Sequence, residues 1–199
     1  MKRFFTVLFL LVALAVSAFT KDEVVQLSAP DKTGGKPLMQ ALSERHATRD
    51  FSDKPISAEI LSNLLWATWG INRPDGHRVA PTAKNKQEVI VYVAKNDGVW
   101  RYEASSHSLV KVLDKDYRTD FENSTISFVY AAPKGEFDPL HVGALFQNAG
   151  LYSASVDLGN VVRQKYIGVL EGKLPLPKGY KIYITQSFGW PKYEPSVTK

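Results

Sequence analysis

Residues 89–104 read V-I-V-Y-V-A-K-N-D-G-V-W-R-Y-E-A. Two runs rich in β-branched and aromatic residues flank the turn sequence Lys95–Gly98, and Asp-Gly at such a place is typical of a tight hairpin. A second turn, Ser105-Ser106-His107, leads into another strand-like run over 108–113. The stretch therefore predicts three neighbouring antiparallel strands, and we place the rest of the chain around that sheet.

Helical patterns lie on both sides of this meander. A short amphipathic helix is predicted from Pro37 to about Arg45, and a second helix begins after the N-cap residue Ser57 and closes at Gly70. The later elements expected are a strand over 127–132, a long apolar helix over 139–158, a helix from Asn160 to about Glu171 and a strand over 180–186. Because the order lacks regular βαβ alternation, we predict an α+β fold in which helices flank an antiparallel central sheet.

The first residues have the layout of a secretory signal peptide. Lys2 and Arg3 precede the uncharged apolar run Phe4–Ala18, which ends in small residues suited to cleavage. A membrane anchor is the alternative, but 15 apolar residues fall short of the roughly 20 that span a bilayer. We therefore predict a signal peptide over 1–18, a flexible leader over 19–36 and one domain over 37–199. The expected location is periplasmic or secreted, with no stable membrane span after cleavage.

Composition excludes several classes of function. The chain has no cysteine, which removes disulfides, thiolate nucleophiles and lipid attachment at an N-terminal cysteine. Without Lys2 and Arg3 there are 23 basic and 20 acidic residues, and the resulting charge of +3 is too small to indicate nucleic acid binding. Four scattered histidines give no metal-binding spacing and no clear acid–base catalyst.

The stretch Glu44–Phe51, E-R-H-A-T-R-D-F, is the first candidate site. Arg45 and Arg49 stand four residues apart at the predicted helix end, and two close guanidinium groups form a permanently charged receptor for phosphate. The alternative is a solvated basic helix end, where arginine also suits the helix dipole.

A second candidate lies in the long polar loop over 71–86. Loops longer than about 12–15 residues without structure of their own are often functional. Asn85 and Gln87 can each donate and accept hydrogen bonds, so they suit the polar edge of a ring or a sugar-like chain. Side-chain hydrogen bonds that merely close the loop are the alternative.

Three segments together resemble the nitroreductase family of FMN enzymes. R-H-A-T-R-D-F over 45–51 is close to the family's R-R/H-S-x-R/K-x-F, and A-P-T-A-K-N-K-Q-E over 80–88 is similar to A-P-S-x-x-N-x-Q-P. The sequence Asp157-Leu158-Gly159-Asn160, at the end of the predicted long helix, looks like the family's G-L-G segment, and Gly189-Trp190-Pro191 also fits. The resemblance spans about residues 37–191.

The resemblance implies an FMN-dependent oxidoreductase, a flavoprotein that passes hydride from a donor, typically NAD(P)H, to a nitroaromatic, quinone or related acceptor. It also implies a homodimer with FMN at the subunit interface, for which Trp66, Trp69, Phe146 and Trp190 are candidate contacts and core packing is the alternative. A cation near the reduced ring would stabilise it, and the candidates are Arg49, Arg78, Lys84 and Lys86. The expected cofactor-binding residues are Arg45, His46, Ala47, Arg49, Pro81, Thr82, Asn85, Gln87, Leu158, Gly159 and Lys192.

Three positions depart from the family pattern. Ala47 replaces a common serine, Glu88-Val89 replaces a proline and an aromatic residue, and only Lys192 and Lys199 stand where a basic pair often holds the phosphate. These departures motivate a second hypothesis, a non-catalytic flavin-binding or carrier module. A purely structural exported domain is a third. Export also conflicts with a cytoplasmic nicotinamide donor.

Overall fold

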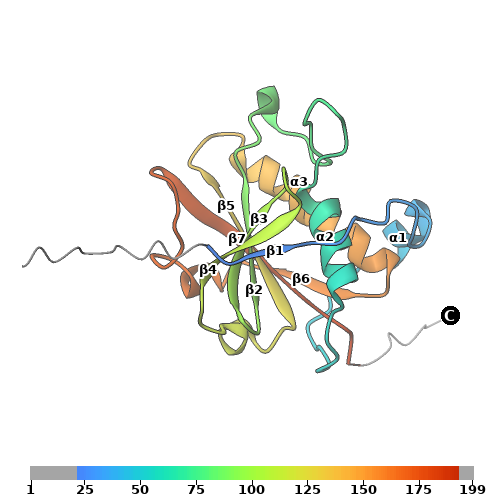
Figure 1. Ribbon diagram of the computed structural model, residues 1–199. Coiled ribbons are helices and arrows are strands. Elements are labelled where there is room, and N and C mark those ends of the chain that lie inside the picture. The colour runs from blue at the N-terminus through green and yellow to red at the C-terminus, as the bar shows by residue number, and fades with distance from the viewer. Residues whose placement is uncertain (1–21, 193–199) are drawn as a thin grey trace, which may run out of the picture.

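The computed structural model describes residues 22–192, which form a seven-stranded antiparallel sheet. The strand order is β1-β4-β3-β2-β5-β7-β6 (Figure 1). The strands are β1 Val24–Gln26, β2 Ile90–Lys95, β3 Gly98–Glu103, β4 Ser108–Leu113, β5 Ile126–Pro133, β6 Gly159–Arg163 and β7 Tyr180–Gly189. The predicted hairpin and meander are β2, β3 and β4, and the predicted fold class is confirmed.

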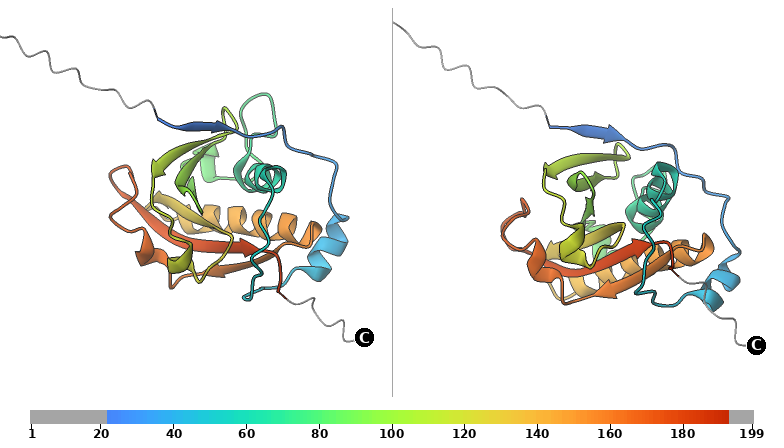
Figure 2. Two further views of the ribbon diagram at one scale, coloured as in Figure 1. Left: turned by 60° about the horizontal axis from the view of Figure 1, so that its bottom comes forward. Right: turned by 90° about the horizontal axis from the view of Figure 1, so that it is seen from below.

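Three helices accompany the sheet: α1 Leu38–Glu44, α2 Ala58–Trp69 and α3 Asp138–Ser155. The Ser57 side chain caps α2 by accepting from the Ile60 N–H at 3.2 Å, as the sequence predicted. The views in Figures 1 and 2 place α2 and α3 on the same face of the sheet, with α1 beside the C-terminal end of α3. Short 3-10 turns are η1 Ala83–Asn85, η2 Arg118–Phe121 and η3 Ile167–Val169.

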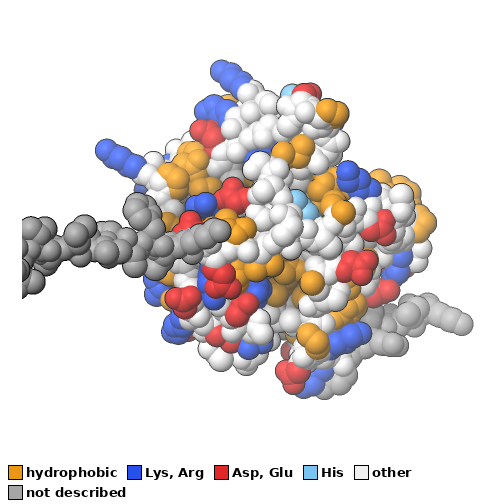
Figure 3. All heavy atoms as spheres, viewed as in Figure 1, with side chains coloured by type: hydrophobic (Ala, Val, Ile, Leu, Met, Phe, Trp, Pro, Cys, Tyr) orange, Lys and Arg blue, Asp and Glu red, His pale blue; other side chains and the backbone are white. Residues whose placement is uncertain are grey.

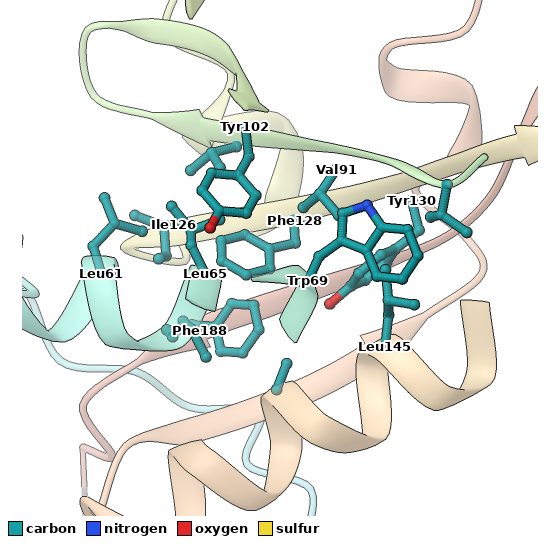
Figure 4. Close-up of a cluster of buried hydrophobic side chains, with 14 of the residues drawn as sticks. Leu61, Leu65, Trp69, Val91, Tyr102, Ile126, Phe128, Tyr130, Leu145 and Phe188 are labelled. Atoms are coloured by element: carbon teal, nitrogen blue, oxygen red, sulfur yellow. The ribbon is translucent and has the colours of Figure 1, made fainter. Parts of the chain in front are cut away.

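Alternation along the central strands divides the core in two, because successive side chains of a strand point to opposite faces. In β5, Phe128 and Tyr130 face the helices, whereas Val129 and Ala131 face the other side. Figure 4 shows the helix-side core, in which Trp69 of α2 and Leu145 of α3 close over the sheet. The opposite face is covered by residues from η2, η3 and the chain leading to β7: Tyr117, Phe121, Tyr166, Leu170 and Leu174.

Part of the segment predicted to be a flexible leader is attached to the domain. β1 pairs with β4 from Val24 to Gln26, and the chain then runs along the outside of the molecule to α1 (Figure 2). The Asp31 N–H donates to Asn63 Oδ1 at 2.8 Å, which fixes this run to α2. These long-range contacts cannot be inferred from a polar composition, and residues 1–21, with the predicted signal peptide, lie outside the described part.

A buried polar cluster also holds this N-terminal run. The Ser62 hydroxyl donates to the Ser28 carbonyl at 2.6 Å, so its oxygen accepts from His107 Nε2–H at 2.7 Å. His107 Nδ1 is then the acceptor for the Tyr102 hydroxyl at 2.8 Å. Both ring nitrogens are therefore used by the neutral imidazole.

Acidification is expected to destabilise the fold through His107. Burial lowers the pKa of His107 below its usual 6.5, so the unfolded chain binds more protons than the folded chain between the two pKa values. The contribution of His107 to folding stability should be fully present above about pH 6.5. It should be lost as the pH falls from there through the lowered pKa of the folded state. Thermal unfolding midpoints from pH 7.5 to 5 would measure this, and His107→Gln should flatten the profile. An unchanged profile in His107→Gln would contradict the assignment.

The helix predicted from Asn160 to about Glu171 is wrong. Residues Gly159–Arg163 form β6, which pairs with β7 from Gly159↔Gly189 to Arg163↔Thr185. Val161 and Val162 favour a strand, and the open edge of β7 supplies the ladder partners that override a helical pattern. The long helix also ends at Ser155, earlier than predicted. Among residues 22–192, no helix has the length and apolar character needed to cross a bilayer.

Candidate active site

The segment that follows α1 is attached to one edge of the sheet. The Thr48 N–H donates to the Asn160 carbonyl at 2.8 Å, and the Ser52 N–H donates to the Trp190 carbonyl at 2.8 Å. The Lys192 N–H donates to the Asp50 carbonyl at 3.0 Å. These bonds bring the predicted residues at 45–49, 158–159 and 192 into one region, although they are far apart in the sequence.

Two glycines make this close approach possible. Gly159 and Gly189 face each other across the β6–β7 ladder. A Cβ on Gly159 would lie 2.8 Å from Thr48 Cγ2, and a Cβ on Gly189 would lie 2.7 Å from Phe51 Cγ. The paired glycines thus form a bare patch on which Thr48 and Phe51 lie, which explains the glycines that the family resemblance marked at these positions.

Gly189→Ala is expected to destabilise the protein by about 1–3 kcal/mol, the usual cost of forcing extra atoms into a packed site. The Phe51 ring would have to move, together with the segment that carries the arginines. Urea unfolding would measure the loss. Gly168→Ala is the matched control because a Cβ there meets nothing within 4 Å, and equal stability of the two variants would contradict this packing.

Arg45 and Arg49 do not share a helix turn. α1 ends at Glu44, Arg45 is its C-cap with extended backbone angles, and Arg49 lies farther along the docked segment. Both residues are exposed, and neither guanidinium makes a hydrogen bond or an ion pair with any residue from 22 to 192. Exposed guanidinium groups with no carboxylate partner are available to an anion.

A pocket of about 860 Å³ opens beside this segment, within the range of small-molecule sites. It brings together the predicted residues His46, Leu158 and Gly159, whereas the other predicted residues do not line it. Its full lining is Glu44, His46, Thr48, Ser52, Lys54, Ala154, Asp157, Leu158, Gly159, Asn160, Trp190 and Pro191. Ala47 is exposed and pairs with Asn160 through its backbone, so its missing hydroxyl leaves no gap in the fold.

The two carboxylates in the wall of this pocket, Glu44 and Asp157, both form ion pairs. Lys36 bonds to both Glu44, at 2.6 Å, and Asp157, and these contacts raise the pKa of Lys36 and lower that of Glu44. Lys54 lies over the Trp190 ring at 4.2 Å from its centroid. Both wall carboxylates are therefore paired to Lys36 and do not neutralise Arg45 or Arg49.

The loop that carries Asn85 and Gln87 is a separate cluster. Arg78 Nε donates to Gln87 Oε1 at 2.9 Å, and Gln87 Nε2 donates to Asn85 Oδ1 at 2.9 Å. Because a guanidinium cannot accept, it fixes the orientation of both amides. Asn85 therefore presents its NH₂ to solvent. Thr82 Oγ1 accepts from the Gln87 N–H at 3.1 Å, and Pro81 is exposed.

Arg78 is held by uncharged groups. Its Nη1 donates to the Trp69 carbonyl at 2.9 Å, its guanidinium lies 4.5 Å from the Trp69 ring centroid, and it pairs with no carboxylate among residues 22–192. Burial lowers the pKa of Arg78, yet an arginine stays protonated in proteins. The cluster thus keeps a positive charge next to two amides.

The backbone of this loop is strained. Lys84, Asn85 and Gln87 have φ of 54°, 52° and 53°, values in the left-handed region that cost energy for residues other than glycine. The Ala83 N–H donates to Nε2 of the buried His141 at 2.8 Å, which ties the loop to the first turns of α3. Such strain needs support from the surrounding structure and often marks functional sites.

The two groups of predicted residues lie toward opposite ends of α3. His141 holds the amide loop, whereas a Cβ on Gly150 would lie 3.8 Å from Arg45 Cδ. Nine helical residues separate these anchors by about 13.5 Å along the axis. Only an extended ligand can reach both groups. Sequence reasoning also missed Asn160, which looked like a helix cap but is buried in β6 and lines the pocket.

Comparisons with known proteins agree with this architecture. A protein from Ralstonia eutropha JMP134, whose crystal structure is described as that of a nitroreductase, shares 32% identity over 86% of this chain and 90% of its own, with a TM-score of 0.78. A structure from Desulfovibrio desulfuricans, described as a nitroreductase in complex with FMN, shares 20% identity over 82% and 91% of the two chains, with a TM-score of 0.58.

A relative from Methanocaldococcus jannaschii, named as a nitroreductase, is 24% identical over an alignment of 166 residues that covers 70% of this chain and 83% of that protein. The family model described as the nitroreductase family matches residues 42–190. That match includes the docked arginine segment, the amide loop and the Gly159–Gly189 pair. The chain belongs to the nitroreductase family.

Proposed function

We propose that the protein is an FMN-dependent oxidoreductase that passes hydride or electrons from a reduced small-molecule donor, such as NAD(P)H, to a nitroaromatic, quinone or similar acceptor. The observation that carries the proposal is the pair of exposed arginines, Arg45 and Arg49, which have no ion-pair partner among residues 22–192 and lie on the segment docked over Gly159 and Gly189. Membership of a family with an FMN-bound relative supports the identity of the anion.

Two groups of residues in this chain would bind different parts of the cofactor. Arg45 and Arg49 bind the phosphate, with Lys192 nearby because its N–H donates to the carbonyl of Asp50, next to Arg49. Asn85, held by Gln87, donates to the ring edge, and Arg78 supplies positive charge to the same region. When bound, FMN supplies the hydride chemistry. No side chain is assigned an acid–base role.

The absorption spectrum of the purified protein tests this proposal. A flavin spectrum that bleaches with a reduced donor and returns with an acceptor would support the enzyme. Stable flavin that no donor reduces would instead favour the non-catalytic flavin-binding module. A colourless protein that takes up no FMN in excess would contradict both.

We also propose a homodimer. Of the four aromatic residues considered as contacts, Trp69 is buried in the core, and Phe146 and Trp190 are partly buried against it. Trp66 is partly exposed, and its Nε1–H donates to the Ile71 carbonyl at 3.1 Å. More exposed apolar side chains lie on α1, at Leu38, Met39 and Leu42, and at the start of α3, at Phe137 and Leu140. Figure 3 shows apolar atoms over the α1 side of the molecule. Light scattering after gel filtration should give twice the monomer mass. Met39→Glu, which places a charge on this apolar surface, should lower the measured mass toward that of the monomer.

Export remains part of the proposal. It rests on the sequence of residues 1–18, which have the charge and apolar layout of a signal peptide. Sequencing the N-terminus of the protein recovered from the periplasm or medium would test it. An intact Met1 on protein confined to the cytoplasm would contradict it.

A further inference from the structure

A chain of three buried side chains runs from the middle of the sheet to the wall of the pocket. The Tyr130 hydroxyl donates to Gln186 Oε1 at 2.7 Å, and Gln186 Nε2 donates to Asn160 Oδ1 at 2.9 Å. Tyr130 and Gln186 are fully buried, and Asn160 is 6% exposed. No charged group takes part.

The orientation of these amides is fixed by a backbone carbonyl. Gln186 Nε2 also donates to the carbonyl of Phe146 at 3.2 Å. Because a carbonyl only accepts, the Gln186 NH₂ must face it, and the Gln186 oxygen must face Tyr130. Because the same NH₂ also donates to Asn160, it must face the Asn160 oxygen. The Asn160 NH₂ therefore points away from Gln186.

That NH₂ has no partner among residues 22–192, although Asn160 lines the pocket and is more than nine-tenths buried. A Cβ on Gly150 would lie 3.5 Å from Asn160 Oδ1 and 3.8 Å from Arg45 Cδ, so Asn160 and the arginine stem meet at the same place on α3. An amide NH₂ can only donate, so this group, which makes no hydrogen bond to residues 22–192, is complementary to an oxygen acceptor that enters the pocket.

We propose that Asn160 is a further cofactor-binding residue, whose NH₂ donates to an oxygen of the phosphate or ribityl chain of FMN. Gln186 and Tyr130 are its positioning residues, since Gln186 donates to the Asn160 oxygen and Tyr130 donates to the Gln186 oxygen. The inference rests on the proposed function, because it needs FMN at the arginine end of the site. It adds a contact that the family motifs do not contain.

Titration with FMN and with riboflavin, followed by flavin fluorescence, tests the assignment. Asn160→Ala should weaken FMN binding about 10- to 100-fold, the range for loss of one hydrogen bond to a charged or strongly polar group. Unchanged riboflavin binding would place the contact on the phosphate, and an equal loss would place it on the ribityl chain. Tyr130→Phe should weaken FMN binding to a smaller extent, because Gln186 loses the donor that faces its oxygen.

Asn63→Ala is the matched control. Asn63 is similarly buried, at 8% exposed, and accepts from the Asp31 N–H outside the pocket, so its loss should reduce stability and leave FMN affinity unchanged. If Asn160→Ala fails to fold, Asn160→Asp keeps the acceptor for Gln186 and puts an oxygen where the NH₂ was. Wild-type affinity in either Asn160 variant would overturn the inference alone. A wild-type protein that binds neither flavin would overturn the proposed function as well.

Discussion

The double variant Arg45→Ala/Arg49→Ala is expected to lose FMN binding by at least about 100-fold, because each charge-assisted contact contributes roughly a factor of 10 or more. Stability should change little, since neither guanidinium has a hydrogen-bond or ion-pair partner within the described chain. Equilibrium dialysis against FMN and riboflavin would measure the effect. Riboflavin, which lacks the phosphate, should be affected far less than FMN.

Arg118→Ala is the matched control for the arginine pair. Arg118 is partly exposed and bonded to Asp116 by several contacts, so it is already neutralised. It should leave FMN affinity unchanged. If the double variant also bound FMN with wild-type affinity, the phosphate site would have to lie elsewhere.

Arg78→Leu should reduce both stability and cofactor binding. It removes the donors to Gln87 and to the Trp69 carbonyl, together with the contact to the Trp69 ring. We expect a stability loss of about 2–3 kcal/mol from these partly buried groups. FMN affinity should fall about tenfold, because the positive charge beside Asn85 is lost and Gln87 is then oriented only by the bond from its Nε2 to the Gly76 carbonyl at 3.2 Å.

Arg73→Leu provides the control on the same loop. Arg73 is exposed and donates to Asn72 Oδ1 and to the Arg78 carbonyl, but it makes no hydrogen bond to Asn85 or Gln87. Urea unfolding and FMN titration of both variants would separate the roles. Equal behaviour of the two variants would contradict the orienting role of Arg78.

Local chemistry explains which elements the sequence could predict. The Asp97-Gly98 turn and the Ser57 cap depend on neighbouring residues, and both are present as predicted. β6 could not be predicted, because its strand geometry comes from pairing with β7, which begins 17 residues after β6 ends. The attachment of β1 to β4 also depends on a distant partner.

The candidate site shows the same division. Residue types and spacing indicated Arg45, Arg49 and Asn85, but not that about 13.5 Å of α3 would separate the anchors of the two groups. The buried hydrogen bonds of Asn160 and Gln186 join residues that are far apart in the sequence and meet only in the folded protein. Asn160 therefore carried no signal that distinguished it from a helix cap.

The central claim is that guanidinium groups of the segment docked on the glycine pair bind the phosphate of FMN. A crystal structure of the wild-type protein with FMN would test it most directly. We predict phosphate oxygens within hydrogen-bonding distance of Arg45 and Arg49, with the ring extending toward Asn85. FMN bound with its phosphate away from both arginines would contradict the claim.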